Sequence, residues 1–126
     1  MSETYYLDID DVLRIHARQI EQFGGAEGLR DAGLIEAALM RPQSGYYSDI
    51  IEEAASLWES LTMNHGFVDG NKRVGLACTY AFLGANDIKI TASPPALIDF
   101  IYSNLEAGTF TKDILNGWLR GNTSRR

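Results

Sequence analysis

The sequence predicts an all-α protein in which a compact bundle of about six helices surrounds one central buried helix. First, apolar residues recur at three- and four-residue spacings through most of the chain, which is the pattern of one helical face. Second, glycines, prolines and capping residues divide this pattern into six segments. Third, residues 71–86 are apolar on most faces, as expected of a helix that others enclose.

Length and composition indicate one globular domain, residues 1–126. The chain is 45% hydrophobic and 22% charged, which provides enough apolar surface for a single core. Its formal net charge of -6 argues against direct binding of nucleic acid or an anionic membrane, which relies on summed positive charge. Cys78 is the only cysteine, so no internal disulfide can form and a reducing compartment is expected. With no secretory signal and no bilayer-length apolar run, the sequence predicts a soluble cytoplasmic domain.

The first two helices are predicted at residues 8–25 and 30–42. The first has apolar residues at helical spacing and ends at a pair of glycines that begins at Gly24, because glycine adopts the left-handed conformation of a helix C-terminus. In the second, Asp31 is a candidate N-cap, and Pro42 stops the helix.

The next two helices are predicted at residues 50–65 and 71–86. A loop, QSGYYSD, precedes them at residues 43–49, and the short stretch FVDG separates them. Residues 50–65 carry one broad apolar stripe and give the strongest helical pattern in the chain.

The C-terminal part contains two more predicted helices. Residues 87–92 are expected to be a short extended segment. A serine cap followed by proline opens a helix at 93–108, and Thr111 is expected to cap the last helix, 111–121. Residues 122–126 are expected to be frayed.

Groups that react or bind anions are concentrated in one stretch, HGFVDGNKR, from His65 to Arg73. It lies at the N-terminus of the predicted central helix, where free N–H groups and the helix dipole favour an anion. Gly70 would let a phosphate approach the backbone, and Asn71 and Lys72 add donors. Because cations are unfavourable at a helix N-terminus, their presence there suggests that an anion normally occupies the site.

Two further members of this stretch suggest a reaction. Asp69 is a carboxylate beside the anion site, and Mg²⁺ is typically held by one or two carboxylates together with phosphate oxygens. His65 is a candidate general base, because the unperturbed pKa of a histidine side chain suits this role at neutral pH. Together these residues suggest phosphoryl or nucleotidyl transfer to a hydroxyl on another molecule.

The stretch resembles the Fic/Doc family motif, commonly written HxFx(D/E)GN(G/K)R. The matching residues are His65, Phe67, Asp69, Gly70, Asn71 and Arg73. Residues 15–42, IHARQIEQFGGAEGLRDAGLIEAALMRP, look like the front of Doc-type (death on curing) toxins, and the likeness covers about residues 5–119. The resemblance implies an all-α Fic fold.

The resemblance also implies roles for individual residues. His65 would be the general base that acts on the target hydroxyl, and Asp69 would bind Mg²⁺. Phe67 would anchor the loop in the core, and the loop at 43–49 falls where the family places a flap that docks the target. The nucleotide phosphates would be held, and their charge neutralised, by Gly70, Asn71, Lys72 and Arg73.

Lys72 distinguishes two branches of the family. AMP-transferring members usually have glycine at this position, and commonly a further arginine where this chain has Leu76. Doc-type members have lysine and are associated with transfer of the γ-phosphate of ATP to a threonine of elongation factor Tu. The resemblance therefore implies an ATP- and Mg²⁺-dependent protein kinase that acts as a toxin and blocks translation, with Lys72 and Arg73 counted among its catalytic residues.

Two alternatives remain open: an AMP or nucleotidyl transferase on the same scaffold, and a catalytically decayed module that binds an antitoxin. Doc-type toxins are typically silenced by a separate antitoxin. The chain has no recognisable inhibitory (S/T)xxxE(G/N) segment of its own, so a cognate antitoxin acting in trans is the expected partner.

Three residues depart from the family pattern. Gly66 stands where many relatives have proline or a larger residue, and is expected to loosen the loop after the base. Val74 and Gly75 stand where Doc-like chains often have threonine and alanine. Glycine within a helix costs about 1 kcal/mol relative to alanine.

Other conspicuous side chains are expected to be structural. His16 lies on the apolar stripe of the first helix and is interpreted as a hydrogen-bonded, partly buried residue. Tyr46 and Tyr47 either contact the target or anchor their loop. The remaining three are expected in the core: Trp58, Cys78 and Trp118.

Overall fold

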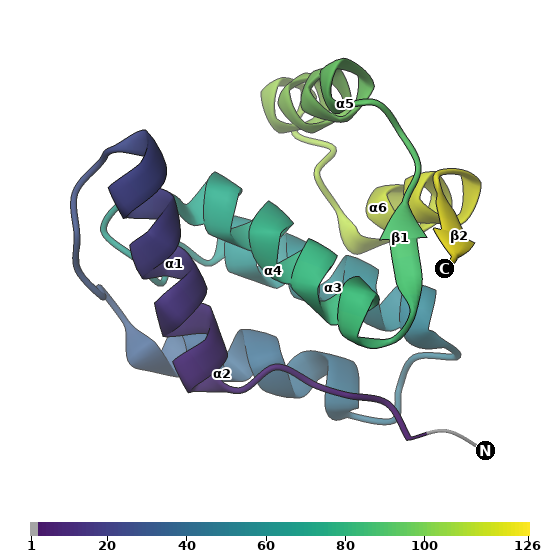
Figure 1. The fold of residues 1–126 in the computed structure, drawn as a ribbon, viewed down its shortest axis with the longest axis horizontal. Coiled ribbons are helices and arrows are strands. Elements are labelled where there is room, and N and C mark those ends of the chain that lie inside the picture. The colour runs from purple at the N-terminus through teal and green to yellow at the C-terminus, as the bar shows by residue number, and fades with distance from the viewer. Residues whose placement is uncertain (1–2) are drawn as a thin grey trace.

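Six α-helices and one short pair of strands make up residues 3–126, the part of the chain that the structure, a computed structural model, describes (Figure 1). The elements in chain order are α1 (Ile9–Phe23), α2 (Ala32–Met40), the 3-10 turn η1 (Arg41–Gln43), α3 (Ile50–Met63), α4 (Asn71–Ala85), β1 (Ile88–Ile90), α5 (Pro94–Ala107), α6 (Lys112–Gly121) and β2 (Thr123–Arg125). The prediction of an all-α fold with about six helices is confirmed. Within the described range, no helix combines the length and the apolar character needed to cross a membrane.

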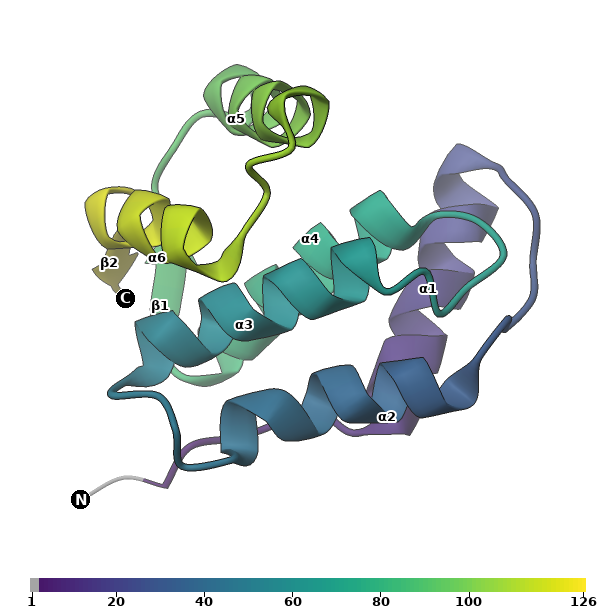
Figure 2. The same cartoon turned by 180° about the vertical axis from the view of Figure 1, so that it is seen from behind.

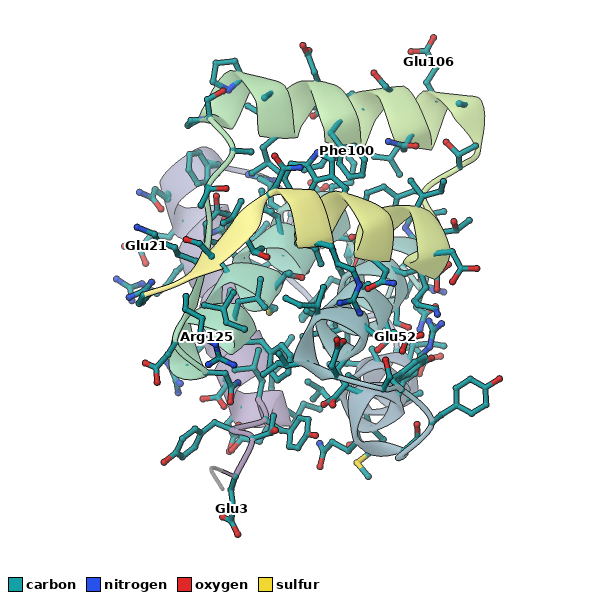
Figure 3. The ribbon with its side chains drawn as sticks, turned by 90° about the vertical axis from the view of Figure 1, so that its right-hand side faces the viewer. Glu3, Glu21, Glu52, Phe100, Glu106 and Arg125 are labelled. Carbon is teal, nitrogen blue, oxygen red and sulfur yellow. The ribbon has the colours of Figure 1, made fainter. Side chains whose placement is uncertain are left out.

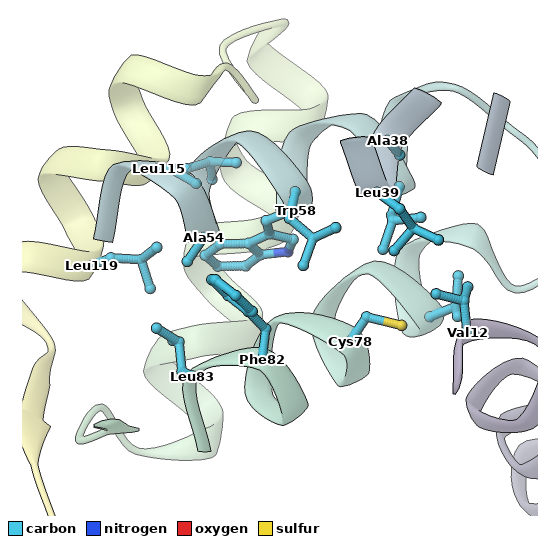
Figure 4. Close-up of a cluster of buried hydrophobic side chains, with 14 of the residues drawn as sticks. Val12, Ala38, Leu39, Ala54, Trp58, Cys78, Phe82, Leu83, Leu115 and Leu119 are labelled. Carbon is cyan, nitrogen blue, oxygen red and sulfur yellow. The ribbon is translucent and has the colours of Figure 1, made fainter. Parts of the chain in front are cut away.

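Helices α3 and α4 lie side by side at the centre, and the other helices pack around them (Figures 1 and 2). Helices α2 and α6 pack against α3, while α1 crosses α4. Trp58 of α3 and Phe82 and Cys78 of α4 meet in the core between them (Figure 4). Helix α3 contributes eight buried residues and α4 seven, so the predicted central helix shares the centre with its neighbour.

Aromatic side chains fix the C-terminal helices to this centre. Phe100 points from α5 towards α6 (Figure 3), where its ring stacks on Trp118 with centroids 4.7 Å apart. Trp58 is fully buried and contacts both rings, at 6.1 Å and 5.9 Å between centroids. Burial raises the pKa of the Cys78 thiol to about 12, so this cysteine is an unreactive core residue. The core placement predicted for Trp58 and Cys78 is confirmed, whereas Trp118 is half-buried and packs against the core.

Side chains cap the helices where the sequence indicates. Asp31, Ser93 and Thr111 accept N–H bonds from Leu34, Ala96 and Ile114, respectively, as predicted. Asp8 forms a reciprocal capping box with Asp11 at the start of α1. These caps fix where each helix begins, and therefore where the loops between helices start and end.

The C-terminal residues are not frayed, contrary to the prediction for 122–126. Strand β2 pairs with β1 in antiparallel register, with Lys89 opposite Ser124. Flanking backbone bonds, from Thr91 N–H to the Asn122 carbonyl (2.7 Å) and from Arg126 N–H to the Asp87 carbonyl (2.9 Å), extend the pair. The segment looked featureless in the sequence because its order comes from a distant partner strand.

Two glycines that depart from the family pattern lie at close contacts. A Cβ on Gly75 would meet the Thr62 backbone nitrogen at 3.2 Å and would overlap its hydroxyl, so glycine lets α3 and α4 approach each other. A Cβ on Gly66 would lie 2.8 Å from Ile35 Cγ1. The Gly66 carbonyl also accepts the N–H groups of Arg30 and Asp31, so this glycine does not loosen the loop as predicted.

Candidate functional site

The loop between α3 and α4 opens onto a cleft of about 630 Å³. The cleft is bounded by the end of α3, the loop, the start of α4 and one side of α5, which contributes Tyr102 and Leu105. The six polar or glycine positions that the sequence predicts as site residues all line it: His65, Asp69, Gly70, Asn71, Lys72 and Arg73. One cavity therefore brings together the whole predicted set.

His65 lies in a left-handed backbone conformation, with φ of 53°. Helix α3 ends at Met63, so His65 is outside the helix that was predicted to reach residue 65. A non-glycine residue in this conformation costs roughly 1 kcal/mol or more. Arg30 compensates from the other side of the loop: its Nε donates to the His65 carbonyl at 2.6 Å. The side chain of His65 is exposed and lines the cleft.

The interior of the loop is closed by Phe67 and Asn71. Phe67 is 2% exposed, and the Asn71 side chain both accepts its N–H (3.1 Å) and donates to its carbonyl (3.0 Å). Because the Asn71 amide is committed to these bonds, the residue can offer a ligand its backbone N–H rather than its side chain. The position of Phe67 agrees with the anchoring role that the resemblance implies.

His16 supports the same loop from α1. Its ring stacks on Phe67 with centroids 3.7 Å apart and planes within 5°. Its Nε2 lies 2.7 Å from the Asp69 carbonyl oxygen, which can only accept, so Nε2 carries the proton in this bond. His16 is 5% exposed, which confirms the structural interpretation and shows that it is more deeply buried than predicted.

Asp69 is held as an ionised carboxylate by two backbone donors. The N–H of Ala26 donates to Oδ2 at 3.1 Å, and the N–H of Gly70 donates to Oδ1 at 2.8 Å. These two bonds, with Arg73 nearby, lower the pKa of Asp69 below its ordinary value. The carboxylate keeps free lone pairs, so it can also coordinate a cation.

The bonds to Asp69 lead to a prediction about acid stability. A lowered folded-state pKa means that the stability added by this carboxylate is fully present above about pH 4 and is lost as the pH falls through the lower folded value. We therefore expect Asp69→Asn to destabilise the fold at pH 7, with the difference from the parent shrinking below pH 4. Unfolding in urea at a series of pH values measures this difference. An equal difference at pH 7 and pH 2 would show that ionisation of Asp69 adds no stability.

The start of α4 provides the anion-binding side of the cleft. Gly70 is the N-cap, with φ of 80°, and no side chain among residues 3–126 caps the helix there. The first N–H groups of α4 and the positive end of its dipole therefore face the cleft without a competing side-chain acceptor. This arrangement agrees with the predicted anion site.

Lys72 and Arg73 are held at the edge of the cleft by neighbouring elements. Arg73 donates to the Gly24 carbonyl at 3.0 Å, and its guanidinium lies 5.9 Å from the centre of the Phe23 ring at the end of α1. The Lys72 ammonium lies 5.3 Å from the centre of the Tyr102 ring on α5. Their positive charge is local, in a chain whose net charge is -6.

Two contributors to the site were missed at the sequence level. The segment Gly25–Ala26 lies against the motif: a Cβ on Gly25 would stand 2.8 Å from Asp69 Oδ2 and 3.1 Å from Arg73 Nη2. The sequence did contain a signal for Gly25. Gly24 alone is enough to end the first helix, so a second glycine beside it indicates a further need for a residue without a side chain. Tyr102 gave no such signal, because nothing in the sequence indicates that α5 reaches the cleft.

The residues present fit a Mg²⁺ ion held jointly with phosphate. Among the described residues, no three His, Cys, Asp or Glu side chains gather into a metal-binding cluster. Asp69 is the carboxylate that lines the cleft. Mg²⁺ is usually bound by one or two carboxylates together with substrate phosphates and water, for which Asp69 and the start of α4 are suited.

The predicted flap loop contains one anchored and one exposed tyrosine. Tyr47 accepts a bond from Arg41 Nε at 2.6 Å and lies beneath the Lys112 ammonium, so it anchors the loop. Tyr46 is 85% exposed. The target-docking role of this loop stays a prediction.

Comparison with known proteins gives one family. The family model described as Fic/DOC family matches residues 6–83, more than half of the chain. The chain is 43% identical over 94 residues to "Toxin Doc" of Mycolicibacterium smegmatis, which covers 71% of this chain and 70% of that protein. It is 28% identical over 93 residues to "Protein kinase doc" of Escherichia phage P1, a match that covers 71% of this chain and 74% of that protein. The residues that the family model matches include the loop between α3 and α4 and the start of α4, and the chain belongs to the Fic/DOC family.

Proposed function

We propose that this protein is a Doc-like toxin that transfers the γ-phosphate of ATP to a threonine or serine hydroxyl of a target protein such as elongation factor Tu. The observation that carries this proposal is the single cleft that unites His65, Asp69 and the uncapped start of α4. The names of two relatives, a toxin and a protein kinase, support it.

Each residue would contribute a separate part of the transfer. His65 would take the proton from the target hydroxyl, whose oxygen then bonds to the γ-phosphorus while the bond to ADP breaks. The first N–H groups of α4, with Lys72 and Arg73, would hold the phosphates and offset their charge. Asp69 would hold Mg²⁺, which neutralises phosphate charge when bound.

Lys72 favours the kinase over the AMP transferase. Its ammonium is kept beside Tyr102, within the cleft, where glycine would leave space and no charge. With a positive charge at the start of α4, the phosphates of the nucleotide would be held differently than in family members that have glycine at this position. AMP or other nucleotidyl transfer is the runner-up, because the base, the carboxylate and the helix N-terminus would serve it as well.

A cognate antitoxin is the partner that belongs to this proposal, together with a cytoplasmic location, where translation takes place. A largely apolar groove of about 610 Å³ runs between α1, α4 and α5 beside the cleft. Its wall includes the exposed side chains of Ile98 and Tyr80, and its end includes Lys72 and Arg73. An antitoxin segment with apolar residues and a carboxylate would suit this groove and would restrict access to the cleft.

A translation extract tests the proposal. We expect the purified chain, with ATP and Mg²⁺, to stop peptide synthesis in a bacterial extract, and fresh elongation factor Tu, added after the chain has been removed, to restore it. Mass spectrometry of the factor should find one phosphoryl group on a threonine, and none in a reaction with His65→Asn. Addition of AMP instead would favour the runner-up. Continued synthesis with an unmodified factor would contradict the proposed target.

A further inference from the structure

The segment between α1 and α2 runs beside the loop between α3 and α4, on the right of Figure 2. Val68 N–H donates to the Gly28 carbonyl at 3.0 Å, and Leu29 and Phe67 form an isolated antiparallel bridge. The N–H groups of the next two residues, Arg30 and Asp31, both donate to the Gly66 carbonyl, at 2.8 and 2.9 Å. The middle of the loop that carries the site, residues 66–68, is therefore paired with a segment far away in sequence.

The Arg30 side chain adds two hydrogen bonds to this pairing, and they lie next to His65, the proposed base. Its Nε donates to the His65 carbonyl at 2.6 Å, and its Nη2 donates to the Asn64 carbonyl at 3.3 Å. These carbonyls follow the last turn of α3, at the negative end of the helix dipole, where a guanidinium is favourable. One cation thus caps α3 and fixes the peptide group that joins His65 to Gly66.

We propose that Arg30 is a positioning residue for His65: it holds the left-handed backbone conformation that keeps this imidazole in the cleft. The φ of 53° at His65 is unfavourable for a residue with a side chain and persists only where neighbouring contacts impose it. Arg30 provides such a contact from outside the cleft, since it does not line the cavity. The catalytic consequence rests on the proposed function, in which His65 is the base.

The surroundings of Arg30 distinguish this role from a general contribution to stability. The residue is exposed, and none of the ion pairs formed within residues 3–126 involves it. Its guanidinium is used for backbone carbonyls of the loop instead. Its removal should therefore change the geometry of His65 much more than the free energy of unfolding.

Kinetics with Arg30→Ala test the proposal. We expect kcat for phosphoryl transfer to fall about 10- to 100-fold, because a misplaced base loses alignment, while the Kd for ATP stays within about twofold of the parent value. Guanidinium at millimolar concentration should restore part of kcat in Arg30→Ala and none in His65→Asn. The matched control is Arg14→Ala, which removes an exposed arginine paired with Asp11 on α1 and should leave kcat unchanged.

An NMR measurement tests the positioning independently of any activity. In Arg30→Ala, the carbonyl resonances of Asn64 and His65 and the imidazole signals of His65 should shift, whereas those of His16 should not. If these signals shift but the parent transfers no phosphate, the positioning role stands and the proposed function fails. Unchanged His65 signals, or an unchanged kcat in an active parent, would overturn the proposal.

Discussion

Replacing His65 should abolish phosphoryl transfer while the fold persists. We expect kcat to fall about 10²- to 10⁴-fold, which is the usual contribution of a general base. The fold should survive because the side chain is exposed, and none of the hydrogen bonds within residues 3–126 uses its imidazole. Single-turnover transfer from labelled ATP, measured next to thermal unfolding, tests both expectations.

The choice of variant matters because His65 has a positive φ. Asparagine accepts the left-handed conformation better than alanine and cannot act as the base, so His65→Asn is the cleaner test. His65→Ala serves as the comparison, and a difference in unfolding temperature between the two would report the backbone strain. Transfer by His65→Asn at the parent rate would remove His65 from the role of base.

The largest effect on stability is expected at Gly75. Alanine would gain about 1 kcal/mol from helix propensity. The added methyl group would, however, overlap the Thr62 hydroxyl and stand 3.2 Å from the Thr62 nitrogen, and overpacking of this kind costs about 1–3 kcal/mol. We expect Gly75→Ala to destabilise the fold by up to about 2 kcal/mol in urea unfolding, which is the overpacking cost less the propensity gain, and to disturb the loop through the shifted end of α3.

Gly117 provides the matched control. It also lies inside a helix, α6, but a Cβ there would meet no atom within 4 Å, so Gly117→Ala should stabilise by about 0.5–1 kcal/mol. The Thr62 hydroxyl is buried without a hydrogen-bond partner among the described residues. The Gly75→Ala change should therefore cost less when Thr62 is also alanine. If both glycine variants stabilised the fold, the close approach of α3 and α4 would not depend on Gly75.

The helices could be predicted because their signals are local. Asp31, Ser93 and Thr111 each accept a hydrogen bond from the N–H group three residues further along the chain. Both partners of such a cap can therefore be read from a few consecutive residues. The order of residues 122–126 could not be predicted, because it depends on pairing with β1, and three residues carry no usable alternation. The end of α3 was placed too late because the left-handed backbone of His65, and its contact with Arg30 from another segment, leave no mark in the local pattern.

In the site, too, the features that depend on neighbouring residues could be predicted, and those that depend on distant contacts could not. The six predicted residues that line the cleft fall within nine consecutive positions, so a short pattern was enough to predict them together. The groups that hold this stretch in place are distant: His16 is 53 positions from Asp69, and Arg30 is 35 positions from His65. Gly66 was misread for this reason, since the need for glycine comes from Ile35 on another helix.

A paired labelling experiment with ATP and Mg²⁺ decides which group the protein transfers. The chain and elongation factor Tu would receive ATP labelled at either the α- or the γ-phosphate, with His65→Asn as the control. We expect only the γ-label to become bound to the factor, and only with the parent chain. Transfer of the α-label, or of the γ-label by the His65→Asn variant at the same rate, would contradict this expectation.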